Sequence, residues 1–112
     1  MDEDFGASPL FIASTFGHKS VVQLLFQNGV DIHASEHAGI TSLHLAAREG
    51  HTDLLKYLVK QGQSPEAVTD SGTSPLWYAA YYGKVETAKL LLRRYKCDPE
   101  SANERGESNF NP

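Results

Sequence analysis

The sequence offers little to place the chain in a membrane or in an oxidising compartment. Its uninterrupted apolar runs are only a few residues long, far short of the roughly 20 that a membrane-spanning helix needs. The acidic start, residues 1–5, has no apolar segment behind a basic stretch, so no secretory signal is visible. The single cysteine, Cys97, cannot form an internal disulfide bond, which fits a reducing compartment. We therefore expect an intracellular protein, cytoplasmic or nuclear, without membrane insertion.

An excess of basic residues and the short motifs of common enzymes are also missing. Ten Lys and Arg residues stand against 14 Asp and Glu, a formal net charge of −4, which argues against nucleic acid as the main partner. No GxSxG motif, phosphate-binding loop or dinucleotide fingerprint occurs, and Cys97 lacks the flanking pattern of a catalytic nucleophile. The sequence predicts a protein that is not an enzyme and needs no cofactor. A catalytic domain is the alternative that a screen for hydrolase or transferase turnover would test.

Five histidines raise the question of a metal site. His33, His37 and His44 lie close together in the sequence. However, zinc sites usually add cysteine or carboxylate ligands in a compact geometry. We expect no metal site.

The sequence contains internal repeats of fixed length. Similar segments begin at Gly6, Gly39 and Gly72, so the period is 33 residues twice over. A fourth start, Gly106, comes 34 residues after Gly72, which indicates one inserted residue around residues 93–100. Four further columns recur in all three copies: Leu10, Leu43 and Leu76; Ala13, Ala46 and Ala79; Gly17, Gly50 and Gly83; and Leu25, Leu58 and Leu91.

Each copy has the pattern of two short helices separated by a tight turn. In the first copy Ser8 can cap a helix, Pro9 fits its first turn, and Gly17 can end it. A second helix is predicted over about residues 20–28, with a broad apolar stripe and Gly29 as its stop. Helices of two or three turns are unstable alone in water, so neighbouring copies must pack against each other.

Segments 30–39 and 63–72 connect consecutive copies. They combine extended and turn-forming residues, which predicts projecting hairpins.

These units resemble the ankyrin repeat. The segment Thr41–Ala47, TSLHLAA, is similar to the family signature TPLHxAA, and Ser8–Leu10 and Ser74–Leu76 both read SPL. The period of 33 also matches the family. The resemblance implies an all-α solenoid of helix-turn-helix units joined by β-hairpin loops, in a single domain over residues 1–112. We expect three full repeats and a partial fourth, at about residues 3–35, 36–68, 69–102 and 103–112.

The sequence departs from the signature at a few positions. Ser42 stands where the family usually has Pro, and Phe11 and Trp77 replace the His that His44 preserves. In the family this His is a structural hydrogen-bonding residue, which is a further reason to expect no metal there. Residues 95–97 replace a glycine stop and add a residue, so the path of the chain between 93 and 99 stays open at this point.

The resemblance implies a concave face of hairpin tips and first helices that binds proteins. The two columns before each mid-unit glycine carry charged residues in the second copy, so we expect them to face water in all copies, and exposed aromatic side chains favour binding. Coverage of a terminal repeat is the other explanation for Phe16 or Tyr82, and stapling of the first turn is the other explanation for Phe5. The candidate partner-binding residues are Asp4, Phe5, Thr15, Phe16, His37, Ile40, Arg48, Glu49, Asp70, Ser71, Thr73, Tyr81, Tyr82 and Arg105.

The first copy and the fourth start do not have the polar outer faces that terminal repeats of a solenoid need. We therefore expect further ankyrin repeats or domains of a parent chain. The alternative function is a regulatory or targeting segment of a larger enzyme, channel or signalling protein. Hydroxylation of a hairpin Asn, known for some ankyrin repeats, is disfavoured because that column holds His33.

Overall fold

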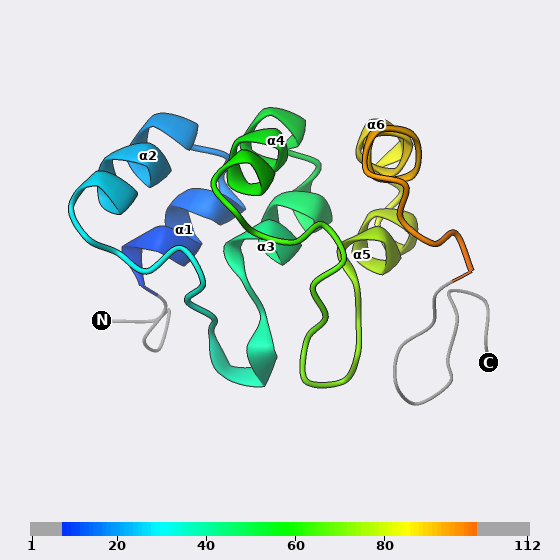
Figure 1. The fold of residues 1–112 in the computed structure, drawn as a ribbon, viewed down its shortest axis with the longest axis horizontal. Helices are drawn as coiled ribbons and strands as arrows, with labels where there is room; N and C mark the ends of the chain where they lie inside the picture. Colours follow the sequence, from blue (N-terminus) through cyan, green and yellow to red (C-terminus); the bar gives the residue numbers. More distant parts are fainter. Residues whose placement is uncertain (1–7, 101–112) are drawn as a thin grey trace.

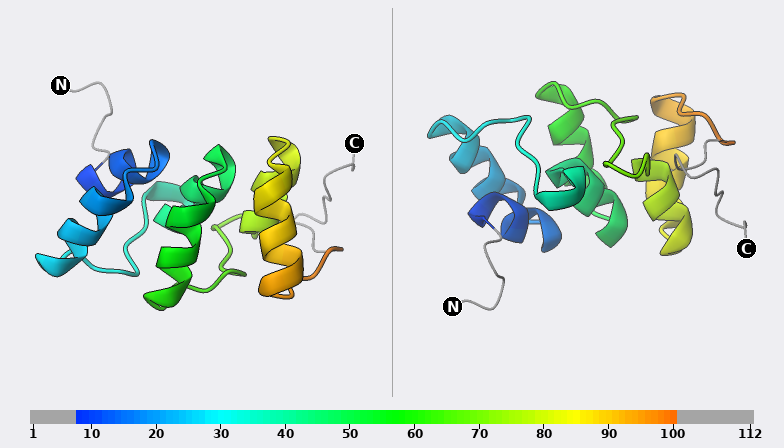
Figure 2. Two further views of the ribbon diagram at one scale, coloured as in Figure 1. Left: turned by 90° about the horizontal axis from the view of Figure 1, so that it is seen from above. Right: turned by 90° about the horizontal axis from the view of Figure 1, so that it is seen from below.

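The computed structural model describes residues 8–100, which form three helix pairs placed side by side (Figure 1). One layer, here called the inner layer, contains α1, α3 and α5. The other, the outer layer, contains α2, α4 and α6, and the connecting loops extend away from the helices (Figures 1 and 2). The all-α solenoid predicted from the sequence is confirmed. We call these pairs repeats 1, 2 and 3: α1 (Pro9–Thr15) with α2 (Lys19–Gln27), α3 (Ser42–Glu49) with α4 (Thr52–Lys60), and α5 (Pro75–Tyr81) with α6 (Val85–Lys89) and the π-helical turn η2 (Leu90–Arg94).

Side-chain caps explain where the inner helices begin. The hydroxyl of Ser8 accepts a hydrogen bond from the Phe11 amide, and that of Ser74 accepts one from the Trp77 amide. A proline follows each serine at a position where no amide donor is needed. The predicted start of the first helix is therefore confirmed. Its partner, α2, lies within one residue of the predicted range 20–28.

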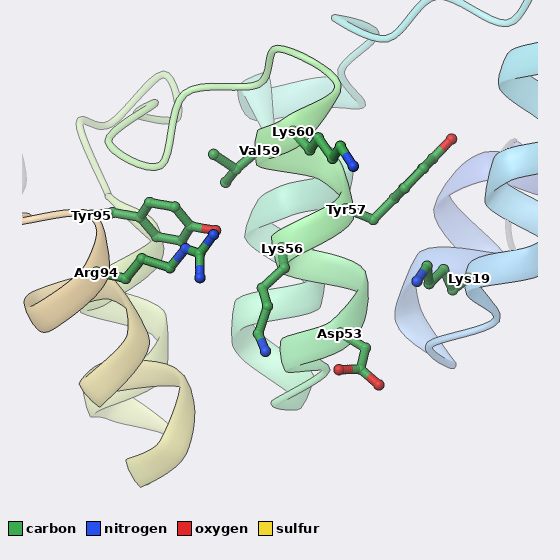
Figure 3. Close-up of a pocket in the computed structure, with 8 residues that line it drawn as sticks. All are labelled: Lys19, Asp53, Lys56, Tyr57, Val59, Lys60, Arg94 and Tyr95. Atoms are coloured by element: carbon green, nitrogen blue, oxygen red, sulfur yellow. The ribbon is translucent and has the colours of Figure 1, made fainter.

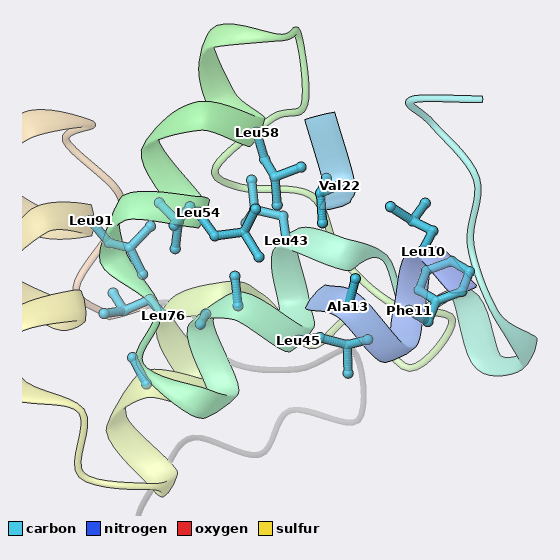
Figure 4. Packing of buried hydrophobic residues seen from close by; sticks show 14 of the residues in the cluster. Leu10, Phe11, Ala13, Val22, Leu43, Leu45, Leu54, Leu58, Leu76 and Leu91 are labelled. Atoms are coloured by element: carbon cyan, nitrogen blue, oxygen red, sulfur yellow. The ribbon is translucent and has the colours of Figure 1, made fainter. Parts of the chain in front are cut away.

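The core lies between the two layers and between neighbouring inner helices (Figure 4). Helix α3 packs against α1 on one side and against α5 on the other. Ala46 and Ala47 are fully buried there, and their small side chains let the backbones approach closely. Leu58 and Leu91 close the core from the outer layer and are fully buried. Each such leucine contributes about 1.5–3 kcal/mol.

The loops between repeats are short hairpins with minimal strand character. Ser35 and Thr41 form a β-bridge, and the Glu36 amide donates to the Ile40 carbonyl at 2.7 Å. A short 3₁₀ turn, η1 (His37–Gly39), forms the tip of this first hairpin. The two hairpins are joined directly, because the Asp70 amide donates to the Ala38 carbonyl at 2.8 Å. The predicted hairpins are confirmed.

The inserted residue lies in the last turn of repeat 3. In repeat 2 the Gln63 amide donates to the carbonyl of Leu58, five residues earlier, at 3.1 Å. In repeat 3 the Cys97 amide donates to the carbonyl of Leu91, six residues earlier, at 3.0 Å. The π-helical turn η2 absorbs the extra residue, as such bulges do. Cys97 therefore takes the structural place of Gln63.

Aligning Cys97 with Gln63 also identifies the residue that ends the outer helix of repeat 3. Gly62 has φ of 114°, in the range that favours glycine. At the matching position Lys96 has φ of 58°. The chain between residues 93 and 99 thus keeps the turn of the other repeats, and a lysine occupies the glycine position.

None of the helices within residues 8–100 is both long enough and apolar enough to cross a membrane.

Candidate functional site

The exposed ends of the inner helices carry the columns predicted to face water. Phe16 is 65% exposed, Tyr81 62% and Tyr82 49%. Their predicted exposure is confirmed. In the same columns of repeat 2, the Arg48 Nε and Glu49 Oε2 atoms form an ion pair at 2.9 Å. Thr15 is half-buried, and its hydroxyl donates to the Phe11 carbonyl.

Helix α5 and the residue that caps its C-terminus carry a connected set of aromatic rings, here called the aromatic cluster: Trp77, Tyr78, Tyr81 and Tyr82. Trp77 stacks on Tyr81 with centroids 5.1 Å apart and an interplanar angle of 7°, and Tyr78 stacks on Tyr82 at 6.5 Å. Tyr81 meets Tyr82 edge to face at 5.0 Å. These pairs form because residues four apart lie on one face of a helix. Trp77 and Tyr78 were missed as site residues, although their spacing from the two exposed tyrosines was a usable signal.

His44 supports this cluster from repeat 2. Its Nε2–H donates to the Ala67 carbonyl at 2.8 Å, while Nδ1 accepts a hydrogen bond from the Thr41 amide at 3.1 Å. Its ring meets Tyr78 edge to face at 5.8 Å. Burial is the main cause that lowers the pKa of His44 below its ordinary value, although hydrogen bonds to the backbone oppose the shift. The ring is therefore neutral at pH 7, and its predicted structural role is confirmed.

Trp77 takes the column of His44 but cannot copy its hydrogen bonds. Its indole Nε1–H is buried and finds no acceptor among residues 8–100. The ring instead contributes stacking to the aromatic cluster. At this column His44 makes a hydrogen bond to the following hairpin, whereas Trp77 stacks on the exposed Tyr81.

The hairpin candidates separate by exposure. His37 and Asp70 are exposed, whereas Ile40 and Ser71 are half-buried. Thr73 is only 6% exposed, so its predicted place on an exposed tip is wrong. The reason is that its amide donates to the Thr69 hydroxyl and its own hydroxyl lies 3.2 Å from that of Ser71, which turns it into the hairpin. The predicted contacts Asp4, Phe5 and Arg105 lie outside the described residues.

The C-terminal end of α1 in repeat 1 is in close contact with His51, which precedes α4 in repeat 2. His51 Nε2 donates to the Thr15 carbonyl at 2.8 Å. A Cβ atom at Gly17, which has φ of 72°, would come within 2.6 Å of the His51 ring. Glycine is needed there both for its conformation and for this approach. The predicted contact residues Thr15 and Phe16 therefore lie next to a direct contact between repeats 1 and 2.

A hydrogen bond within repeat 2 accounts for the serine at position 42. The Gln63 Nε2 atom donates to the Ile32 carbonyl at 2.7 Å and to the Ser42 hydroxyl at 2.9 Å. Ser42 is fully buried, so its hydroxyl supplies an acceptor that the usual proline would lack.

Other candidate chemistry finds little support in residues 8–100. Cys97 is buried, and its Sγ donates to the Pro65 carbonyl at 3.6 Å. Burial, with a smaller effect from Glu66, raises the pKa of the Cys97 thiol to about 11, whereas a nucleophilic cysteine needs a lowered one. Within this part of the chain no three His, Cys, Asp or Glu residues are grouped so that they could hold a metal ion.

The repeated helix pairs agree with comparisons to known proteins. A family model described as ankyrin repeats in three copies matches residues 10–103. Comparison with curated proteins gives no match. Ankyrin repeats are generally modules of protein–protein interaction and are typically not catalytic. Because the match covers most of the sequence and each copy folds as the expected helix pair, the chain belongs to the ankyrin-repeat family.

Proposed function

We propose that the protein is a non-catalytic interaction scaffold that binds a protein partner through the exposed ends of its inner helices and its hairpin tips. We call this surface the inner face; it comprises Phe16, Arg48, Glu49, Tyr81 and Tyr82, with His37 and Asp70 on the tips. The observation that supports it best is the exposed, internally stacked aromatic cluster of α5.

Stacking makes these tyrosines suited to binding. Tyr81 and Tyr82 are largely exposed, yet each ring rests on another aromatic ring. Little rotamer freedom is therefore left to lose when a partner covers them. Aromatic side chains are enriched among the residues that dominate binding energy. Covering each ring would contribute about 1.5–3 kcal/mol.

The neighbouring Arg48 and Glu49 give the inner face a polar edge. The charge of Arg48 acts on Tyr78 of the aromatic cluster, where it opposes the effect of burial on the tyrosine pKa. Its ion pair with Glu49 is partly exposed. Charged groups at the rim of an interface contribute orientation and specificity more than affinity. We expect the partner to place apolar or aromatic side chains on the tyrosines and opposite charges near this pair.

The test is binding by a variant of the inner face. Arg48→Ala/Tyr81→Ala/Tyr82→Ala and the unchanged chain are immobilised separately, and proteins captured from a cell lysate are compared. A control, Val21→Ala/Leu24→Ala, removes exposed apolar side chains from the outer helix α2. Circular dichroism must first show equal helicity and similar melting for all three proteins.

A partner captured by the unchanged chain and by the control, but lost from the triple variant, supports the proposal. Its affinity for the purified chain should then fall at least about tenfold in the variant, which corresponds to about 1.4 kcal/mol. Equal capture by all three proteins would argue against the inner face.

A further inference from the structure

Charge is distributed unevenly between the two sides of the molecule. Within residues 8–100, the outer elements carry six basic and only two acidic residues: Lys19, Lys56, Lys60, Lys89, Arg93 and Arg94 against Asp53 and Glu86. Most of the described acidic residues lie elsewhere: Asp31, Glu36, Glu66 and Asp70 in the two hairpins, and Asp98 and Glu100 in the segment after η2. A chain with a formal charge of −4 therefore has a locally basic outer surface.

Four of these basic residues line a groove on this surface (Figure 3). Its volume is about 540 Å³, and it runs over α4 between α2 and η2. Lys56 and Lys60 come from α4, Lys19 from α2 and Arg94 from η2. We call it the outer groove. Among residues 8–100, Asp53 is the single carboxylate that lines it.

Aromatic rings hold two of these cations at the groove. The Lys19 ammonium lies 5.9 Å from the centroid of the Tyr57 ring, and the Arg94 guanidinium carbon lies 5.8 Å from that of Tyr95. Cation–π contacts of this kind keep a charge near the surface without neutralising it. Figure 3 shows Arg94 and Tyr95 reaching toward α4 from one side, with Lys19 on the other side of α4.

We propose that the outer groove binds an extended acidic segment of a partner protein. Neighbouring packed helices lie roughly 10 Å apart, so the cations of α2, α4 and η2 recur at about that interval along the stack. An extended peptide advances about 3.3 Å per residue. Carboxylates at every third position of the peptide therefore face successive helices. The half-buried rings of Tyr57 and Tyr95 contact the peptide backbone between them.

The shape of the site and the charge of the whole chain favour a peptide over other anionic partners. A lipid surface is flat on this scale and leaves the outer groove unfilled. A nucleic acid carries charge along its full length and is repelled by the acidic hairpins and by the net charge of −4.

The outer groove is distinct from the inner face. It belongs to the outer helices, whereas the aromatic cluster belongs to α5 in the inner layer (Figure 1). The two surfaces can therefore be tested independently, since variants of one leave the other unchanged.

The experiment is a titration followed by nuclear magnetic resonance, at low salt because exposed charges are screened over about 10 Å at 0.1 M. The probe is a synthetic peptide with four Glu residues at every third position and Ser and Gly between them. A second peptide of the same composition has its four Glu residues adjacent. Vesicles rich in phosphatidylserine and a thymidine oligonucleotide are titrated in parallel.

We expect saturable shifts at the amides of Lys56, Lys60, Arg94 and Tyr95, with the spaced peptide binding at least about threefold more tightly than the block peptide. Lys56→Glu/Arg94→Glu should weaken binding at least about tenfold. The control Lys89→Glu/Arg93→Glu makes the same charge change outside the groove and should weaken it about threefold or less.

Three results would overturn the proposal: no binding of the spaced peptide, an equal loss in the control variant, or tighter binding of vesicles or oligonucleotide at these amides. The first two would show that the charges do not form a site, and the third would assign the groove to another class of partner.

Discussion

Repeats 2 and 3 have the same backbone fold, but the side chains at equivalent positions make different contacts. In repeat 2, His44 and Gln63 donate hydrogen bonds to carbonyl groups of the neighbouring hairpins. In repeat 3 the matching residues are Trp77, whose Nε1–H has no acceptor among residues 8–100, and Cys97, which makes only a weak contact to the Pro65 carbonyl.

The difference shows how one repeat can serve mainly as framework and the next as surface. Repeat 2 has a helix pair on each side, so its inner columns are buried and their polar groups must be paired. Repeat 3 has one such neighbour within the described residues and places its aromatic rings toward solvent. Substitutions in repeat 2 should therefore cost stability, and those in repeat 3 should cost binding.

The largest expected effect is that of His44→Ala. It leaves the Ala67 carbonyl and the Thr41 amide without their partner and opens a cavity, so the free energy of unfolding should fall by about 2–4 kcal/mol. Tyr81→Ala in repeat 3 should lower it by at most about 1 kcal/mol, because the side chain is largely exposed. Urea denaturation measures both. Equal losses would remove the distinction between framework and surface.

A second comparison uses the column shared by Gln63 and Cys97. Gln63→Ala removes two hydrogen bonds from Nε2 and leaves the Ile32 carbonyl and the buried Ser42 hydroxyl without this partner, a loss of about 1–3 kcal/mol. Cys97→Ala removes a small side chain and one weak contact, so its cost should be about 1 kcal/mol. Thermal melting of the two variants would reveal a reversed order, which would contradict the register assigned to the inserted residue.

The third prediction concerns pH. Burial lowers the pKa of His44 below its ordinary 6.5, so below that pH the unfolded chain takes up a proton that the folded chain resists. Stability from this group is complete above about pH 6.5 and falls as the pH decreases, by up to about 1.4 kcal/mol per pH unit. Urea denaturation between pH 7.5 and 5 should show this slope, and His44→Ala should reduce it. An unchanged slope in the variant would mean that other groups cause it.

The smallest effect is expected where the outer helices end. Lys96→Gly relieves a left-handed conformation that lysine adopts at a cost, so it should raise stability by about 0.5–1 kcal/mol. Gly62→Lys introduces the same strain in repeat 2 and should lower stability by a similar amount, about 0.5–1 kcal/mol. Opposite signs in thermal melting would confirm that the two positions are equivalent; a stabilising Gly62→Lys would show that they are not.

Much of the fold could be predicted from local signals. The cap at Ser8, the proline that follows it and the 33-residue period placed the helices within a residue. The 34-residue spacing between Gly72 and Gly106 revealed the inserted residue. Its position became clear only from the structure, in which the Cys97 amide donates to the Leu91 carbonyl. That choice is made by packing at the end of η2.

The candidate site was predictable in part. Exposure of Phe16, Tyr81 and Tyr82 followed from charged residues in the same columns of repeat 2. The burial of Thr73 and the supporting role of Trp77 were not foreseen, because both depend on contacts made after the chain folds. The contribution of Ser42 likewise required Gln63, a residue 21 positions away.

The sequence alone determined the family, the period and the alternation of short helices, because caps, glycines and apolar columns act over a few residues. Only the tertiary structure decided which polar groups are paired, how the inserted residue is accommodated and where charge gathers. These features depend on residues that are distant along the chain and are brought together when neighbouring repeats pack.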